Sequence, residues 1–180
     1  WLQQVHGTRI VDAATVQPGV EADGSWSRHA NVVCAVLTAD CLPVLLSDRH
    51  GRCVAAIHAG WRGLAAGVVE AAVTALPATG SDLIAWLGPA IGPQTFAGGE
   101  EVRAAFVAHD PQAAAAFAPG PDGSLRADLY QLARQRLAGA GVLAVYGGQD
   151  CTLTDAARFF SYRRDGVTGR MASLIWLAGG

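Results

Sequence analysis

Apolar residues occur in short runs along the first part of the chain, and polar or glycine-rich turns separate these runs. Residues 32–37 and 42–46 are apolar and rich in β-branched side chains, which is typical of strands. A turn at residues 48–51 precedes another apolar run at residues 53–57. The pattern predicts two strands, the second of which forms a hairpin with residues 53–57.

Helical periodicity follows the glycine-rich turn at residues 58–63. Residues 64–76 place apolar side chains three and four positions apart, as on one face of an amphipathic helix. The other expected elements are helices at residues 100–108 and 127–137 and strands at residues 83–87, 142–146 and 172–177.

Glycine and proline mark segments without regular structure. Residues 88–93 consist largely of these two residue types and predict a rigid, shaped loop, whereas residues 111–123 are typical of a low-complexity linker. Because strands and helices mix without strict alternation, we expect an α+β fold rather than a doubly wound parallel sheet. With 180 residues, the chain fits one domain, residues 1–180, with its own core.

Composition and charge exclude several classes of protein. Hydrophobic residues make up 51% of the chain and charged residues 16%, which excludes disorder as the overall state. The net charge is −2 without blocks of like charge, so we expect no nucleic-acid partner. No apolar run approaches the ~20 residues of a membrane span and no secretory leader is visible. We therefore expect a cytoplasmic protein without a membrane partner.

The basic residues and the cysteines narrow the chemistry further. All 13 basic residues are Arg, which excludes a lysine Schiff base and a P-loop lysine and leaves Arg to bind any anionic substrate. Cys34, Cys41, Cys53 and Cys151 form no Cys-x-x-Cys pair, so neither a disulfide framework nor a zinc knuckle is predicted. A metal site would draw its ligands from separated strands and loops.

Three residues that can bind metals stand where predicted strands give way to turns, namely His6, Cys41 and His58. Two imidazoles and one thiolate suit Zn²⁺ and leave a fourth position open, and the same donors tolerate copper. Spacing alone is equally compatible with a buried, inert Cys41 and with two histidines that bond to neighbouring loops.

Several ordered motifs make the chain similar to the YfiH family. They are Gln4-Val5-His6-Gly7, Thr38-Ala39-Asp40-Cys41-Leu42-Pro43-Val44, His58-Ala59-Gly60-Trp61-Arg62-Gly63, Gly88-Pro89-Ala90-Ile91-Gly92-Pro93, Asp150-Cys151-Thr152, Phe160-Ser161-Tyr162-Arg163-Arg164-Asp165-Gly166 and Thr168-Gly169-Arg170. The family comprises purine nucleoside phosphorylases, formerly called polyphenol oxidases or laccase-domain proteins. The resemblance covers nearly the whole chain.

The resemblance implies a zinc ion held by His6, Cys41 and His58. It also implies phosphorolysis of adenosine, inosine, guanosine and S-methyl-5′-thioadenosine, deamination of adenosine, and a four-layer α/β/β/α fold with mixed sheets. The expected partners are a purine nucleoside and phosphate. We expect the family's N-terminal segment to be missing from this chain, which also reads Phe96-Ala97-Gly98 where the family has an aromatic residue, an acid and Val.

Candidate residues for catalysis and substrate binding flank these ligands. Asp40 is a candidate acid/base, although an Asp at this place also makes local turn hydrogen bonds. Arg62 opens a helix after a glycine-flanked turn and fits a phosphate-binding role. Gln4, Ser161 and Arg163 are candidate substrate contacts in the family motifs.

Other readings of the same residues remain open. Arg164 and Arg170 are interpreted as exposed residues of a hairpin, and Trp61 either stacks on a purine or packs into the core. A copper-dependent polyphenol oxidoreductase is a competing class, but a multicopper enzyme needs many histidines and this chain has five. A hydrolase with Cys41 as nucleophile and His58 as base is another.

Overall fold

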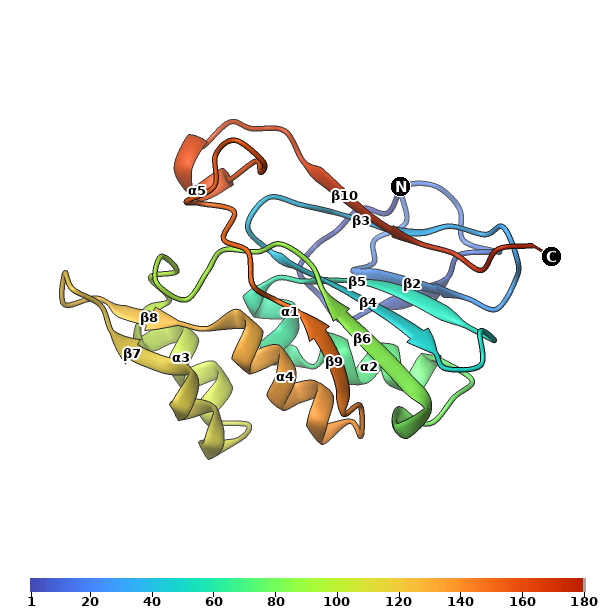
Figure 1. Ribbon diagram of the computed structural model, residues 1–180, viewed down its shortest axis with the longest axis horizontal. Helices are drawn as coiled ribbons and strands as arrows, with labels where there is room; N and C mark the ends of the chain where they lie inside the picture. The colour runs from blue at the N-terminus through green and yellow to red at the C-terminus, as the bar shows by residue number, and fades with distance from the viewer. Residues whose placement is uncertain (180) are drawn as a thin grey trace.

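A mixed six-stranded sheet forms the centre of the computed structural model, which describes residues 1–179 (Figure 1). The strands lie in the order β1-β2-β5-β4-β6-β9. Their bounds are β1 Ile10–Asp12, β2 Gly24–Ser27, β4 Leu42–Asp48, β5 Val54–Ala59, β6 Leu83–Leu87 and β9 Ala144–Gly147. The expected hairpin is confirmed, because β4 pairs antiparallel with β5 from Leu42 opposite Ala59 to Ser47 opposite Val54.

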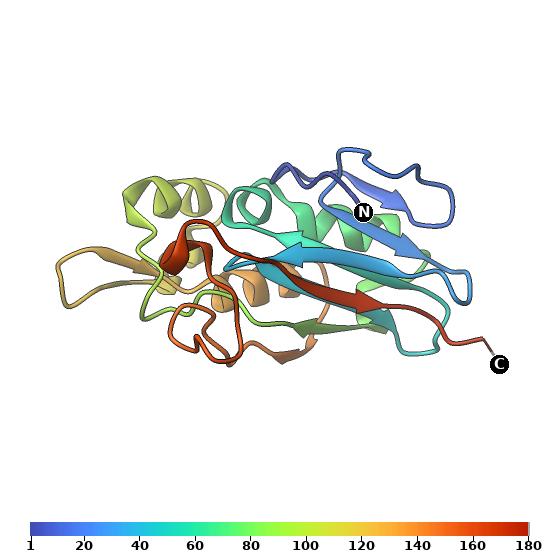
Figure 2. The ribbon, with the colours of Figure 1, turned by 90° about the horizontal axis from the view of Figure 1, so that it is seen from above.

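A second, two-stranded sheet crosses one face of the large sheet. Its strands, β3 Cys34–Thr38 and β10 Met171–Ile175, are antiparallel and join distant parts of the chain (Figure 2). Cys34 and Val36 pack here against Val54 and Ala56 of β5. Since helices cover the other face of β5, every residue of this strand is buried. The chain therefore changes sheets between β3 and β4, where Cys41 lies.

The opposite face of the large sheet is covered by helices and holds the main core (Figure 1). Three of these helices are α1 Trp61–Ala66, α2 Val68–Ala75 and α4 Leu129–Gly139. The single helix expected at residues 64–76 is divided at Gly67, which has a φ of 101°. A left-handed residue ends one helix and begins the next, a conformation that favours glycine.

Part of the second half of the chain differs from the sequence prediction. The expected linker at residues 111–123 is wrong, because it contains a 3₁₀ helix, Pro111–Ala116, and the strand β7 Phe117–Pro119. This strand pairs with β8 Leu125–Ala127 beside helix α3 Gly99–Val107. Asp110 caps the 3₁₀ helix by accepting a bond from the Gln112 N–H group. The alanine-rich composition concealed these elements.

Layers of helix, large sheet and small sheet make up the described structure, so the α+β prediction is confirmed (Figures 1 and 2). Among residues 1–179 no helix covers the outer face of the β3–β10 sheet, so the fourth layer stays a prediction. Two shorter helices complete the described elements, a 3₁₀ helix at Gly80–Asp82 and α5 at Tyr162–Asp165. Within this part of the chain, no helix is long and apolar enough to cross a membrane.

Candidate metal centre

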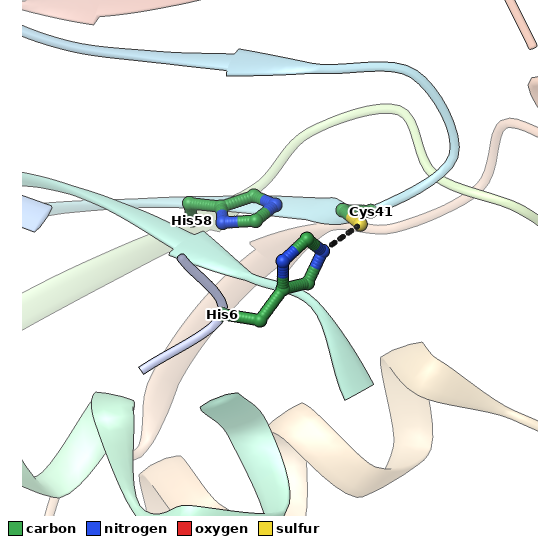
Figure 3. Close-up of side chains that lie close together, drawn as sticks. All are labelled: His6, Cys41 and His58. Carbon is green, nitrogen blue, oxygen red and sulfur yellow. Dashed lines mark hydrogen bonds between the residues drawn. The ribbon is translucent and has the colours of Figure 1, made fainter. Parts of the chain in front are cut away.

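The three predicted ligands come together in the folded chain. One ligand atom from each of His6, Cys41 and His58 lies within 4.8 Å of the others (Figure 3). The Cys41 Sγ atom is 3.7 Å from His6 Nε2, and the two imidazole centroids are 4.7 Å apart. His6 is exposed and His58 is buried. The cluster is therefore anchored in the core and open to solvent on one side.

Separate elements deliver these ligands. His58 is the penultimate residue of β5, and Cys41 follows the turn by which the chain leaves β3 for β4. Both His6 and Asp40, the residue before Cys41, have left-handed backbones, with φ values of 61° and 89°. Such angles are uncommon for residues other than glycine and mark turns that the surroundings hold in place.

Asp23 organises the cluster, and sequence reasoning missed it. Its fully buried carboxylate lies 2.8 Å from His58 Nδ1 and accepts N–H bonds from Val5, His6 and Gly7. A carboxylate on one imidazole nitrogen leaves the other free to bind a metal, which is the usual support of a ligating histidine. One carboxylate thus orients His58 and fixes the turn that carries His6.

The cluster alters the protonation of its own members. Burial alone would raise the pKa of the Cys41 thiol, but hydrogen bonds with His58 and His6 outweigh it and lower this pKa to about 7. Burial would lower the pKa of His58, whereas its bonds to Asp23 and Cys41 raise it to about 9. The geometry therefore favours a thiolate, the form of cysteine that binds metals and acts as a nucleophile.

Two glycines make room for the His6 turn. A Cβ atom at Gly60 would lie 2.6 Å from His6 Cδ2 and 3.3 Å from Cys41 Sγ. A Cβ atom at Gly63 would lie 2.8 Å from the Gly7 carbonyl oxygen. The distances of 2.6 and 2.8 Å are too short for a Cβ atom unless its neighbours move. The glycines after His58 thus allow a distant segment to reach the strand end.

The residues present fit a metal ion. Two imidazoles and a thiolate converge, one imidazole has a carboxylate partner, and one side is open to solvent. Zinc sites with catalytic roles combine three such protein ligands with an open position, and copper accepts the same donor types. The other histidines, His29, His50 and His109, are exposed and lie outside the cluster.

Two chambers meet beside the cluster. The larger has a volume of about 540 Å³, and its lining includes the three ligands, Tyr162 and Arg170. The smaller has a volume of about 140 Å³ and is lined by Ala39, Asp40, Cys41, Trp61, Ile91, Phe96, Leu129, Tyr162 and Arg163. Because Cys41 and Tyr162 line both, a small molecule in either chamber lies close to the candidate metal cluster.

Asp40 lies in the smaller chamber and is largely buried. One carboxylate oxygen accepts a 2.6 Å hydrogen bond from the Thr152 hydroxyl, and the other accepts a 2.7 Å hydrogen bond from the backbone N–H group of Arg163. Its backbone oxygen accepts a bond from the Ile91 N–H group. Asp40 thus ties the Cys41 turn to three later parts of the chain.

The predicted arginines differ in their surroundings. Arg163 lines the smaller chamber, with its guanidinium 5.8 Å from the centre of the Phe96 ring. Arg62 lies outside both chamber linings, and its guanidinium is 4.4 Å from the centre of the Trp61 ring. Arg164 is engaged by Asp165 and by three backbone oxygens. Arg170 is exposed, as expected, and also lines the larger chamber.

Gln4 and Ser161 make hydrogen bonds within the chain. The Gln4 amide donates to the Leu37 carbonyl oxygen at 2.7 Å and accepts from the Leu37 N–H group at 2.8 Å. The buried Ser161 hydroxyl accepts from the Arg164 N–H group and caps α5. Gln4 therefore holds the His6 segment against β3, while Ser161 shapes the turn before Tyr162.

A family model described as "Multi-copper polyphenol oxidoreductase laccase" matches residues 1–178. A purine nucleoside phosphorylase of Pseudomonas aeruginosa is 56% identical, and the match covers 98% of this chain and 73% of that protein. The purine nucleoside phosphorylase YfiH of Escherichia coli is 55% identical over the same shares. A crystal structure of a Neisseria meningitidis protein is 51% identical, covers 98% of this chain and 73% of that chain, and has a TM-score of 0.94.

Proposed function

This chain belongs to the YfiH family of purine nucleoside phosphorylases, and we propose that it splits purine nucleosides with phosphate into a free base and a pentose 1-phosphate. The observation that carries the proposal is the His6–Cys41–His58 cluster, which lines the larger chamber and reaches the smaller one through Cys41. Adenosine, inosine, guanosine and S-methyl-5′-thioadenosine are the proposed substrates, and deamination of adenosine is a proposed second reaction.

We propose that His6, Cys41 and His58 hold zinc, with copper as the alternative. When bound, zinc held by three protein ligands supplies a positive charge and an open coordination position beside the substrate. Asp23 keeps His58 in the orientation that this binding requires. Since the described residues contain one cluster of metal-binding side chains, polyphenol oxidation by several coppers is the less favoured reaction.

In phosphorolysis, a phosphate oxygen forms a bond to pentose C1′ as the bond from C1′ to the purine nitrogen breaks. The purine leaves with the bonding electron pair, and its nitrogen takes up a proton. Arg62 is proposed as one ligand of phosphate, for which its guanidinium must leave the Trp61 ring and turn toward the chambers, whose linings it now lies outside. Arg163 is proposed to contact substrate from its place in the smaller chamber.

Asp40, Gln4 and Ser161 complete the proposed set. Asp40 is proposed to move a proton to or from the purine, for which one of its oxygens must exchange its present donor for the substrate. Gln4 and Ser161 are proposed to contact substrate, and both also support the walls of the cleft through the bonds described above.

Separating the products of an adenosine incubation, with and without phosphate, tests this function. We expect adenine and ribose 1-phosphate in equal amounts when phosphate is present. Inosine formed without phosphate would establish the proposed deamination. Adenosine that stays unchanged under both conditions, with the zinc-loaded protein, would contradict the proposed function.

The role of Arg62 has its own test. We expect Arg62→Ala to raise the KM for phosphate more than the KM for the nucleoside. A phosphate dependence equal to that of the wild type would remove Arg62 from the reaction.

A cysteine hydrolase is the second candidate, because the Cys41 pKa is lowered to about 7 beside two imidazoles. The two candidates differ in metal content. A hydrolase would be active without zinc and would lose activity when Cys41 is alkylated. We instead expect activity to follow the zinc content and bound zinc to protect Cys41 from alkylation.

A further inference from the structure

Two of the arginines that form no ion pair within residues 1–179 line the cleft, although the chain as a whole has a net charge of −2. Within residues 1–179, ion pairs engage the guanidinium groups of Arg52, Arg103, Arg126, Arg136, Arg158 and Arg164. Arg163 and Arg170 form no ion pair in this part of the chain, and each lines one of the two chambers. Asp40 lines the smaller chamber with Arg163, whereas the described lining of the larger chamber contains no carboxylate beside Arg170. An uncompensated cation at a cleft favours an anionic ligand.

Arg170 gives the larger chamber a site for an anion. Its Nη1 atom donates to the backbone oxygens of Thr168 and Gly169, which orients the guanidinium. Within the described structure, Nε and Nη2 of Arg170 have no hydrogen-bond partner, so two donors stay available. Adjacent donors of one guanidinium match two oxygens of a phosphate. The same chamber is lined by His6, Cys41 and His58.

The smaller chamber has a different lining. Trp61, Ile91, Phe96 and Leu129 make it largely apolar, and the Arg163 guanidinium lies over the Phe96 ring. This chamber is the smaller of the two, at about 140 Å³ against about 540 Å³, and its apolar walls suit a flat ring system. Aromatic walls and a guanidinium plane are suited to stacking on such a ring.

We propose that the cleft separates its substrates across Tyr162, with phosphate held by Arg170 in the larger chamber and the purine base stacked below Arg163 in the smaller one. Tyr162 is 59% exposed and lines both chambers. The pentose, whose C1′ atom is attacked by phosphate and released by the purine, therefore lies beside Tyr162. Cys41 borders both subsites. The proposal rests on the proposed function for the identity of the two ligands.

Two alanine variants test this division directly. Arg163→Ala removes an exposed side chain and keeps the backbone N–H group that bonds to Asp40, and Arg170→Ala removes an exposed side chain outside any ion pair. Arg103→Ala is the matched control, because Arg103 lies on α3 and pairs only with Glu100. Calorimetry with inorganic phosphate and, separately, with hypoxanthine measures binding to the zinc-loaded proteins without turnover.

We expect Arg170→Ala to weaken phosphate binding at least 10-fold and to change hypoxanthine binding less than 2-fold. Arg163→Ala should show the reverse, and Arg103→Ala should match the wild type. In turnover, the KM for phosphate should rise in Arg170→Ala and the KM for the nucleoside in Arg163→Ala. Arg170→Lys should recover part of the phosphate affinity, because it restores the charge without the paired donors.

Two results would overturn the division. One is wild-type phosphate affinity in Arg170→Ala. The other is an equal loss of both ligands in each variant. If instead the wild type binds phosphate through Arg170 and forms no pentose 1-phosphate, the anion site stands and the proposed function fails.

Discussion

Single residues around the cluster either hydrogen-bond to His6 and His58 or leave space for the side chains of the cluster. Asp23 bonds to His58 and to the backbone of the His6 turn, while Gly60 leaves space for the His6 ring and the Cys41 sulfur. The ligands carry recognisable chemistry in the sequence. Their supports do not, because a carboxylate that accepts backbone bonds and a glycine that lacks a Cβ atom have meaning only beside distant neighbours.

Gly60→Ala tests the space at the cluster. The backbone at Gly60 has a φ of −62°, so alanine adds no backbone strain, but its Cβ atom would overlap the His6 ring. We expect the variant to fold and to lose about 10- to 100-fold in zinc affinity, the range seen when a ligand's support is removed. Gly139→Ala is the control, because nothing lies near its Cβ position. Competition with a chelator measures the zinc affinity of both variants. Equal zinc affinities in Gly60→Ala and Gly139→Ala would contradict the predicted overlap.

Asp23→Asn tests the shared carboxylate. An amide has one acceptor oxygen, so it cannot serve the three N–H groups and His58 as the carboxylate does. We expect a loss of about 10- to 100-fold in zinc affinity and of ~1–3 kcal/mol in the free energy of unfolding. Glu101→Gln, at an exposed position on α3, should keep the zinc affinity. Wild-type zinc affinity in Asp23→Asn would show that Asp23 does not support the site.

The thiols of Cys151 and Cys34 should be alkylated at different pH values. Burial would raise the pKa of Cys151, but hydrogen bonds from Thr154, Thr95 and Gly92 outweigh it and lower this pKa to about 7. Burial raises the pKa of Cys34 to about 11. Since the thiolate is the reactive form, alkylation of Cys151 should reach half of its maximal rate near pH 7 as the pH rises, with Cys34 unmodified. Mass spectrometry of the alkylated peptides measures this, and a midpoint at pH 9 would contradict it.

At the scale of elements, contacts between distant segments build the cleft. The Cys41 turn connects β3 of the small sheet to β4 of the large one, and Asp40 in that turn bonds to Thr152 and to the first turn of α5. This arrangement places Tyr162 and Arg163 in the lining of the smaller chamber, which Cys41 also lines. Sequence periodicity predicted β3 and β4 but not that they lie in different sheets, because pairing partners come from remote parts of the chain.

Thr152→Val tests the link between the Cys41 turn and α5. The substitution keeps the shape of a fully buried side chain and leaves one Asp40 oxygen without its donor. We expect the free energy of unfolding to fall by ~1–3 kcal/mol and amide exchange at residues 160–166 to increase. Thr154→Val is the control, because the Thr154 side chain is exposed. Exchange that stays unchanged at residues 160–166 would show that this bond does not restrain α5.

At the scale of the whole molecule, the mixed fold and the hydrophobic elements could be predicted from the sequence, and so could the convergence of His6, Cys41 and His58 through the family motifs. The short strands β1 and β2 were missed, since strands of three and four residues give little periodic signal. Residues 111–123 were interpreted as a linker because alanine and proline masked a helix and a strand. Asp23 was missed because its partners lie 16 to 35 positions away.

The central claim is that phosphorolysis depends on a metal held by His6, Cys41 and His58. The most direct measurement determines zinc content and release of pentose 1-phosphate from inosine in Cys41→Ala and in Cys151→Ala, whose thiol lies outside the cluster. We predict that Cys41→Ala loses bound zinc and turnover together, while Cys151→Ala retains both. Full zinc content or undiminished phosphorolysis in Cys41→Ala would contradict the account.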